Sequence, residues 1–167
     1  MRKFFITKPN LISRIYFNFI YNKISELIDY KNLNVLDFGG GYGYLKKKLI
    51  SKGANVKIYD VVKELSDLDD YKDFKYEVVI FCQVLVYLKA SEISVLFKEL
   101  KKNVLIISLF STQTILSKIL AFSLGHKNPH KYTITKPDEE ESLIKKNLKI
   151  LKYKNYFFFK VILAIKN

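Results

Sequence analysis

The feature that most constrains this chain is a short apolar run that ends in glycines and leads directly into a helical pattern. Residues 34–38 have the length and apolar content of a buried strand. Glycines follow at 39, 40, 41 and 43, and residues 44–52 then space their apolar side chains as one helix face does. A strand, a glycine turn and a helix in direct succession are typical of an α/β sheet with parallel strands.

Strand and helix patterns continue to alternate along the chain. Residues 55–60, 76–84 and 103–109 are apolar runs of strand length, and residues 91–102 have helical spacing. Strands that alternate with helices need crossover connections, which favour a parallel sheet. We therefore predict a doubly wound, Rossmann-like α/β fold with a mostly parallel sheet.

The C-terminal part of the chain breaks this alternation. Residues 114–124 predict an apolar helix, and residues 137–147 predict a helix that begins at a proline and carries acidic residues near its positive end. Residues 148–153 and 156–165 then read as two strands joined by Lys154-Asn155, which predicts an antiparallel hairpin.

Length and composition fit one domain with a substantial core. The chain has 167 residues, of which 49% are hydrophobic, so we expect a single domain over residues 1–167. Residues 10–30 have helical spacing, which predicts an N-terminal helical extension within residues 1–31. The single cysteine, Cys82, has no internal disulfide partner, and no run of residues reaches the length of a membrane span. These features indicate a cytoplasmic protein.

The glycine turn is the segment that carries chemistry. Glycine at 39, 41 and 43 lets the backbone turn tightly and approach a ligand, and the following helix N-terminus offers N–H groups to an anion. A dinucleotide site would require the spacing G-x-G-x-x-G, but position 44 is Tyr44. Asp37 precedes the first glycine, where a carboxylate suits a ligand that bears a cationic amine, such as S-adenosylmethionine.

A second acidic residue ends the next predicted strand. Asp60 follows residues 55–59 and can accept hydrogen bonds from both ribose hydroxyls of an adenosine. Asp37 and Asp60 are separated by one strand–helix–strand unit of ordinary length. Together they identify a nucleoside ligand more specifically than either does alone.

This pattern resembles the class I S-adenosylmethionine-dependent methyltransferase family from about Leu33 to the C-terminus. In that family an acidic residue and G-x-G-x-G end the first strand, as Asp37, Gly39, Gly41 and Gly43 do here. The resemblance implies that Asp60 binds the ribose and that Gln83 and Val84 border the methionine part of the cofactor. It also implies a reversed last strand in the sheet, and Tyr42, beside the turn, is a further candidate for cofactor contact.

The sequence departs from the family in two places. Only a short segment separates Asp60 from Tyr76, which leaves little room for the usual helix and strand. The acidic residue on the adenine side would fall among residues 67–70, and Asp67 and Leu68 are our candidates. After Leu85, Val86-Tyr87 stands where many small-molecule members carry Glu-His, which removes one catalytic imidazole.

Candidate catalytic side chains are few. His130 lies in the loop that resembles the family's substrate side and is our candidate general base, with an exposed loop histidine as the alternative. Two histidines and a remote cysteine fall short of a zinc ligand set, so no metal is expected. Tyr16 and Tyr21 on the first helix either close over the cofactor or only pack.

The sequence therefore predicts a methyltransferase that uses S-adenosylmethionine and acts on a small-molecule or sugar-type acceptor. The net charge of +13 leaves an RNA methyltransferase as an alternative, but only Arg2 and Arg14 among 29 basic residues are arginines. Nucleic acid is therefore not the favoured partner. A catalytically silent member of the fold that serves as a partner subunit is the other alternative, and the oligomeric state is left open.

Overall fold

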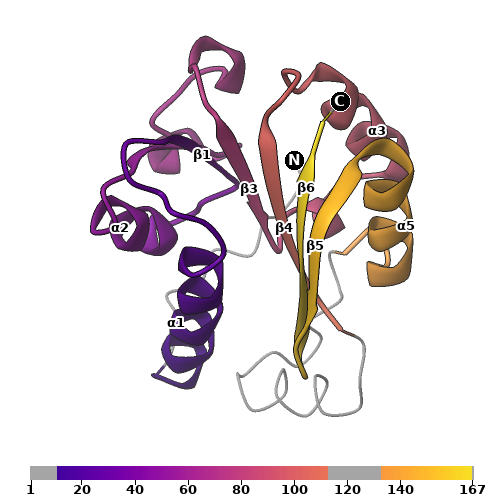
Figure 1. Cartoon of the computed structure of the whole chain (residues 1–167), viewed down its shortest axis with the longest axis horizontal. Coiled ribbons are helices and arrows are strands. Elements are labelled where there is room, and N and C mark those ends of the chain that lie inside the picture. The colour runs from indigo at the N-terminus through magenta and orange to yellow at the C-terminus, as the bar shows by residue number, and fades with distance from the viewer. Residues whose placement is uncertain (1–10, 113–132, 167) are drawn as a thin grey trace.

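The computed structural model describes residues 11–112 and 133–166 and contains one six-stranded sheet (Figure 1). The order across the sheet is β2-β1-β3-β4-β6-β5, and the first four strands in the chain run parallel to one another. Strand β6 is antiparallel to both of its neighbours, β4 and β5. The predicted Rossmann-like sheet with a reversed last strand is confirmed. The strands are β1 (Asn34–Phe38), β2 (Asn55–Tyr59), β3 (Val78–Cys82), β4 (Leu105–Ser111), β5 (Lys149–Asn155) and β6 (Phe159–Ile165).

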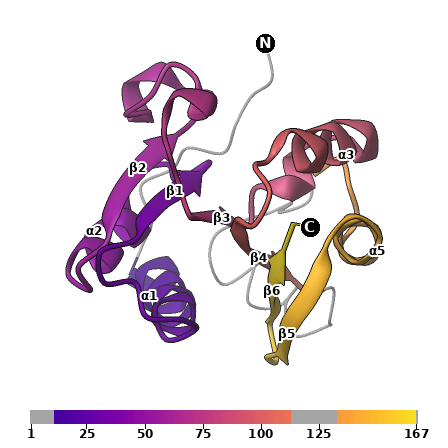
Figure 2. The same cartoon turned by 45° about the horizontal axis from the view of Figure 1, so that its top comes forward.

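Helices cover both faces of this sheet (Figure 2). On one face, α1 (Leu11–Ser25) and α2 (Tyr44–Ile50) bury apolar side chains that include Ile20, Ile24 and Leu49. On the other face, α3 (Ala90–Glu99) and α5 (Pro137–Asn147) bury Phe97 and Ile144. Three short 3-10 turns complete the described elements: η1 (Lys63–Leu65), η2 (Tyr71–Asp73) and η3 (Leu85–Tyr87).

The topology places a switch point, where the strand order reverses, at the centre of the sheet. From β1 the chain crosses to β2 on one side, and it then returns to β3 on the other side of β1. Ligands of open α/β sheets bind at such a switch point, outside the carboxyl ends of the strands. Here that point lies beyond the paired residues Phe38 and Phe81.

The segment between β2 and β3 is as short as the sequence predicts. It holds η1 and η2 and no strand, so β2 forms one edge of the sheet. Polar contacts rather than a helix hold this segment in place, because the Oγ of Ser66 accepts a hydrogen bond from the N–H of Asp60 and donates one to the carbonyl of Leu68.

Several predicted boundaries are wrong by two residues or more, and the structure gives a physical reason for two of them. The N-terminal helix ends at Ser25 rather than near residue 30, and the hydroxyl of Tyr30 donates a hydrogen bond to the carbonyl of Ile24 in its last turn. The hairpin turn lies after Lys154-Asn155, because β5 continues through Asn155 and the N–H of Tyr156 bonds to the carbonyl of Phe159. Aromatic stacking of Tyr156 on Phe159, with ring centroids 4.8 Å apart, accompanies that later turn.

Some predictions concern parts of the chain that the structure does not describe. The helix predicted over residues 114–124, together with His126 and His130, lies outside the described residues. Within residues 11–112 and 133–166, no helix is long and apolar enough to cross a membrane.

Candidate cofactor site

The glycine turn after β1 has the tight backbone that its sequence predicts. Gly39 and Gly41 have φ values of +74° and +52°, in the left-handed region that side chains with a Cβ rarely adopt. A Cβ at Gly39 would also overlap the side chain of Val84, whereas a Cβ at Gly41 would point into open space. Gly39 therefore lets two loops of the sheet pack together, and Gly41 leaves bare backbone facing outwards.

Gly40 is needed for a different reason, which the sequence analysis missed. Its φ is not positive, but a Cβ there would lie 2.7 Å from Oδ2 of Asp37 and 3.0 Å from Ile58. The backbone at Gly40 thus lies directly over the Asp37 carboxylate. The only signal in the sequence was the middle glycine of three in a row, a position that the G-x-G-x-G pattern leaves free.

Asp37 is a buried carboxylate without a hydrogen-bonding partner. The residue is 1% exposed, and neither carboxylate oxygen contacts a donor among the described residues. Burial raises the pKa of Asp37 to about 7, and the nearby carboxylates of Asp60 and Asp67 add to the effect while Lys46 opposes it. A carboxylate in this position is strongly disposed to accept hydrogen bonds from a cationic ligand.

Asp60 connects the glycine turn to the end of β2. Its Oδ2 accepts a hydrogen bond of 3.1 Å from the N–H of Gly41, and its Oδ1 accepts one of 2.9 Å from the N–H of Val62. The side chain is half-buried at the carboxyl edge of the sheet. Each oxygen has a second lone pair with which it can accept a hydrogen bond from a hydroxyl of a ligand.

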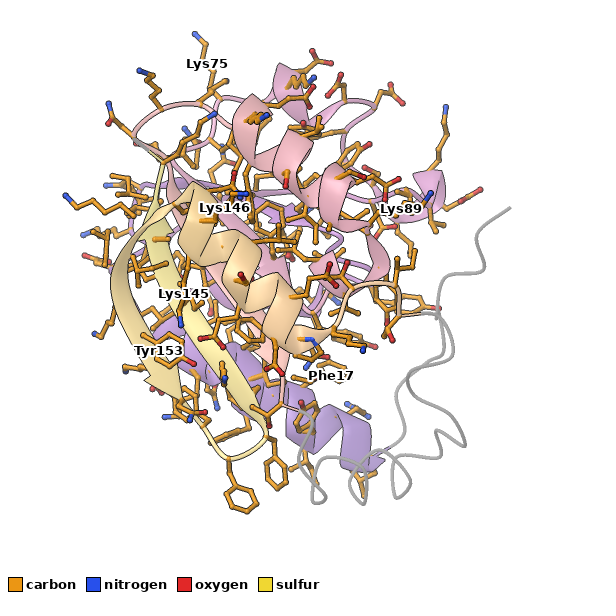
Figure 3. All side chains as sticks on the ribbon, turned by 90° about the vertical axis from the view of Figure 1, so that its right-hand side faces the viewer. Phe17, Lys75, Lys89, Lys145, Lys146 and Tyr153 are labelled. Atoms are coloured by element: carbon orange, nitrogen blue, oxygen red, sulfur yellow. The ribbon has the colours of Figure 1, made fainter. Side chains whose placement is uncertain are left out.

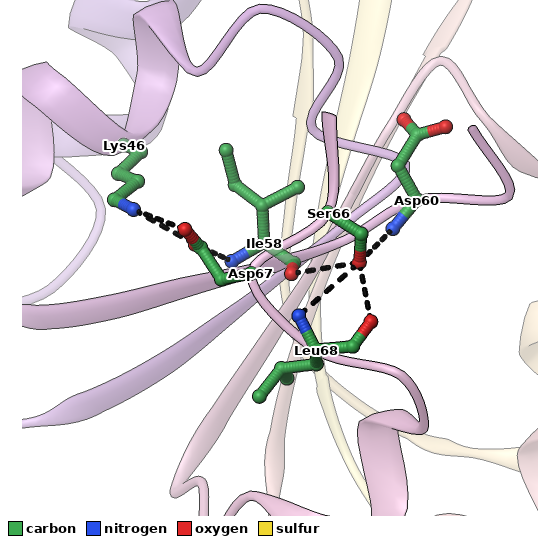
Figure 4. Close-up of polar contacts among 6 residues, drawn as sticks. All are labelled: Lys46, Ile58, Asp60, Ser66, Asp67 and Leu68. Carbon is green, nitrogen blue, oxygen red and sulfur yellow. Dashed lines mark hydrogen bonds and ion pairs between the residues drawn. The ribbon is translucent and has the colours of Figure 1, made fainter. Parts of the chain in front are cut away.

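The carboxylate of Asp67 already has partners within the chain (Figure 4). Its carboxylate accepts a hydrogen bond of 2.7 Å from the N–H of Ile58 and forms an ion pair of 2.8 Å with Lys46. Burial would raise the pKa of Asp67, but the hydrogen bonds from Lys46 and Ile58 bring it below its ordinary value. The neighbouring candidate, Leu68, packs against the core. A direct role for these two residues in binding adenine stays a prediction.

Gln83 and Val84 follow β3 and lie next to the glycine turn. Gln83 has a φ of +56°, which is unusual for a residue with a side chain and is often found where a site constrains the backbone. Val84 lies against Gly39, so the loop after β3 contacts the glycine turn after β1. The structure thus brings together Asp37, Asp60, Gln83 and Val84 from three strand ends.

Helix α1 contributes two tyrosines to this edge of the sheet. The amide of Gln83 donates a hydrogen bond of 3.1 Å to the hydroxyl of Tyr16, and Ser111, at the end of β4, is a second hydrogen-bonding neighbour of that hydroxyl. Burial raises the pKa of Tyr16 and of Tyr21, and the nearby carboxylate of Asp37 raises that of Tyr21 further. Tyr16 therefore does more than pack, although closure of either ring over a cofactor stays a prediction.

Tyr42 and Cys82 are the remaining residues near the glycine turn. Tyr42 is 42% exposed beside the glycine turn, with its ring 6.4 Å from that of Tyr44. Burial raises the pKa of the Cys82 thiol, which disfavours the thiolate and supports its interpretation as a packing residue. Within the described parts of the chain, no group of three or more His, Cys, Asp or Glu residues is placed to hold a metal ion.

A cavity of about 540 Å³ lies at the carboxyl end of β4. It is bounded by the start of α5 and by the β5–β6 turn, and its walls combine aromatic rings with hydroxyl, amide and charged groups. The lining residues are Phe110, Ser111, Thr112, Pro137, Asp138, Asn155, Tyr156, Phe157 and Lys160. This volume falls within the range of small-molecule sites. The sequence analysis missed this cavity because three separate segments form it.

Solved structures share this fold at low sequence identity. Magnesium protoporphyrin IX methyltransferase from Synechocystis PCC 6803, with bound S-adenosylhomocysteine, has a TM-score of 0.61 and 16% identity over 97% of this chain and 90% of that one. The PH0226 protein from Pyrococcus horikoshii OT3 has a TM-score of 0.69 and 15% identity over 92% and 91% of the two chains. A putative S-adenosylmethionine-dependent methyltransferase from Listeria monocytogenes has a TM-score of 0.56 and 16% identity over 89% and 97%.

No protein-family model and no curated protein sequence matches the chain. The likeness to these structures is therefore one of fold, and it agrees with the fold that the glycine turn and the alternating pattern predict.

Proposed function

We propose that this chain is a methyltransferase that binds S-adenosylmethionine at the carboxyl ends of β1, β2 and β3 and methylates a small-molecule acceptor. The observation that carries the proposal is the buried carboxylate of Asp37, which has no partner among the described residues and lies under the backbone of Gly40. The cationic amine of the cofactor would supply the missing partner.

The other residues of the site fit the remaining parts of the same ligand. Asp60 is held by Gly41 and Val62 at the sheet edge, where its carboxylate can accept the ribose hydroxyls. Gly41 has no atom within 4 Å of where its Cβ would stand, so the ligand can approach the backbone closely there. Gln83 and Val84 lie next to the turn, beside the methionine part in this arrangement.

The chemistry follows from holding two reactants side by side. The cofactor supplies a methyl group on a sulfonium, and the chain's contribution is to orient the acceptor atom in line with it. Tyr16 and Ser111 connect the two regions, because Tyr16 contacts Gln83 and Ser111 belongs to both the Tyr16 contact and the cavity lining. The cavity at the end of β4 is therefore our candidate acceptor site.

Proton removal is needed only for an acceptor that must lose a proton in the transfer. His130 remains our candidate base for that case, and its position lies outside the described residues. The volume of the cavity, within the range of small-molecule sites, favours a small-molecule acceptor over RNA, which would need an extended basic surface.

The proposal is tested by calorimetric titration of the purified chain with S-adenosylmethionine, S-adenosylhomocysteine and NAD. We expect both sulfur ligands to bind and NAD not to bind, because the glycine spacing does not suit a dinucleotide. Asp60→Ala should weaken both sulfur ligands by about ten- to hundredfold, since hydrogen bonds to charged groups contribute about 1.5–3 kcal/mol. Asp29→Asn, exposed in the loop between α1 and β1, is the matched control. Failure of both sulfur ligands to bind would refute the proposal.

A further inference from the structure

Helix α1 has an apolar stripe on its outer face. Leu11, Ile15 and Phe19 are spaced four residues apart, and they are 71%, 65% and 45% exposed. The inner face of the helix is a separate surface, since Ile20 and Ile24 are fully buried in the core. Leu11 and Ile15 are therefore not needed to attach α1 to the sheet, and exposed apolar groups of this kind usually mark an interaction site.

The stripe continues onto the turn between β5 and β6. The ring of Phe19 contacts the rings of Tyr156 and Phe159, with centroids 6.4 Å and 5.9 Å away. Phe157, the next residue in the turn, is 63% exposed. Because Phe159 pairs with Ser111 at the end of β4, this surface lies at the carboxyl edge of the sheet. The helix and the hairpin tip both lie towards the lower edge in Figures 1 and 2.

We call the surface formed by Leu11, Ile15, Phe19, Tyr156 and Phe157 the apolar edge. The elements that carry it are basic and lack acidic residues. Residues 11–25 contain Arg14 and Lys23 but no Asp or Glu, and the hairpin of residues 149–165 contains four lysines but no Asp or Glu. The hairpin's side chains extend beside α5, where Figure 3 labels Lys145 and Tyr153.

Three acidic residues lie around this surface, and two of them are paired, while Asp138 is exposed and lines the cavity beside Tyr156 and Phe157. Glu26 forms an ion pair of 2.9 Å with Lys23, and Glu141 forms one of 2.8 Å with Lys160. Arg14 is exposed next to the apolar stripe. An apolar stripe flanked by basic residues is the pattern of helices that lie in the interface of an anionic membrane.

We propose that the apolar edge docks on the surface of an anionic lipid bilayer. Leucine, isoleucine and phenylalanine side chains would enter the boundary between headgroups and acyl chains, while the basic groups beside them meet anionic headgroups. A second copy of the chain is a poorer occupant, because it would bring the basic helix and hairpin of both copies together. Nucleic acid is also poorer, because it offers aliphatic side chains such as Leu11 and Ile15 no apolar depth.

This docking goes beyond the proposed function and does not depend on it. Tyr156 and Phe157 also line the cavity at the end of β4, so the docked face would be the one that faces the candidate acceptor site. That consequence, unlike the docking, rests on the proposed function. Vesicle binding can therefore be measured without any methyl donor, and its failure would leave the cofactor proposal standing.

The test is co-sedimentation of the full chain with vesicles of phosphatidylcholine, with and without about one-third phosphatidylglycerol. We expect binding to the anionic vesicles that is at least about tenfold stronger than to neutral ones and that weakens with added salt. The double variant Ile15→Ser and Phe157→Ser should lose about tenfold or more, since both side chains leave water on docking. Val95→Ser is the matched control, because Val95 is 53% exposed on α3, on the other face of the sheet.

Several results would overturn the proposal. Anionic vesicles that fail to bind the chain, or that bind the double variant as well as the unchanged chain, would do so. If vesicles do not bind, a dimer seen in light scattering that the double variant abolishes would also overturn the proposal. Binding of a single-stranded RNA that the double variant abolishes would do the same. If the double variant fails to fold, Arg14→Glu with Lys154→Glu should still reduce binding to anionic vesicles, and unchanged binding would contradict the proposal.

Discussion

Replacing Asp37 by asparagine should stabilise the ligand-free protein and weaken its binding of the methyl donor. The pKa of Asp37 is 3.8 ordinarily and about 7 in the folded chain. Between these values the folded state binds more protons than the unfolded state, so this group makes stability fall as pH rises from about 4 to about 7. About three pH units at roughly 1.4 kcal/mol each give a deficit of about 4 kcal/mol at neutral pH.

Asparagine cannot ionise, so Asp37→Asn removes this deficit and leaves a buried amide, which costs about 1–3 kcal/mol if it finds no partner. We expect a net gain of about 2 kcal/mol near pH 7. The difference between two pH values is more informative, because the amide's cost cancels. The gain should grow by about 2 kcal/mol between about pH 5 and about pH 7.

Urea unfolding of both proteins at the two pH values measures this difference, with Asp69→Asn as the control for an exposed aspartate. Asp37→Asn should also bind S-adenosylmethionine about ten- to hundredfold more weakly than the unchanged chain, because it loses a charge-assisted hydrogen bond. A variant that is less stable than the unchanged chain by the same amount at both pH values would refute the reasoning. That result would mean that Asp37 is ionised and stabilised in the folded chain.

Four other substitutions test separate parts of the site and the core. Gly39→Ala should lower the free energy of unfolding by about 3 kcal/mol in thermal unfolding, because its φ is left-handed and a Cβ would overlap Val84. Gly41→Ala should lower it by only about 1 kcal/mol yet abolish cofactor binding, and equal stabilities of the two variants would contradict this. Glu140→Gln should raise the stability measured in urea at pH 7 but not near pH 4. Burial raises the pKa of this fully buried carboxyl from 4.5 to about 8, and a raised pKa makes the stability of the unchanged chain fall as pH rises through that window. A loss of stability at both pH values would argue against this reasoning. Tyr16→Phe should change stability by about 1 kcal/mol or less but weaken S-adenosylmethionine about tenfold by releasing the Gln83 amide, and unchanged affinity would exclude this role.

Local signals in the sequence predicted much of the backbone. The strand over residues 34–38 and the helix over residues 137–147 have the predicted bounds, because a glycine closes the first and a proline with acidic neighbours begins the second. The hairpin turn was placed too early because Lys154-Asn155 looks like a turn locally. The stacking of Tyr156 on Phe159 belongs to tertiary structure, which the pattern does not encode.

The candidate site was predicted where residues stand at strand ends and missed where it depends on packing. Asp37 and Asp60 follow from strand and glycine positions alone. The contact between Tyr16 and Gln83 joins residues 67 positions apart, so no local pattern could predict it. Glu140 has the position of an acidic residue in a helix's first turn, and it is one. The fold also turns it inwards, so that one oxygen accepts a hydrogen bond from Ser108 and the other has no partner among the described residues.

The most direct test of the central claim is a crystal structure of the full chain with S-adenosylhomocysteine, which carries the same amine and ribose as the methyl donor. We predict that the amine lies within hydrogen-bonding distance of the Asp37 carboxylate, and that the ribose hydroxyls contact Asp60. A ligand bound elsewhere, with Asp37 still lacking a partner beneath Gly40, would contradict the account.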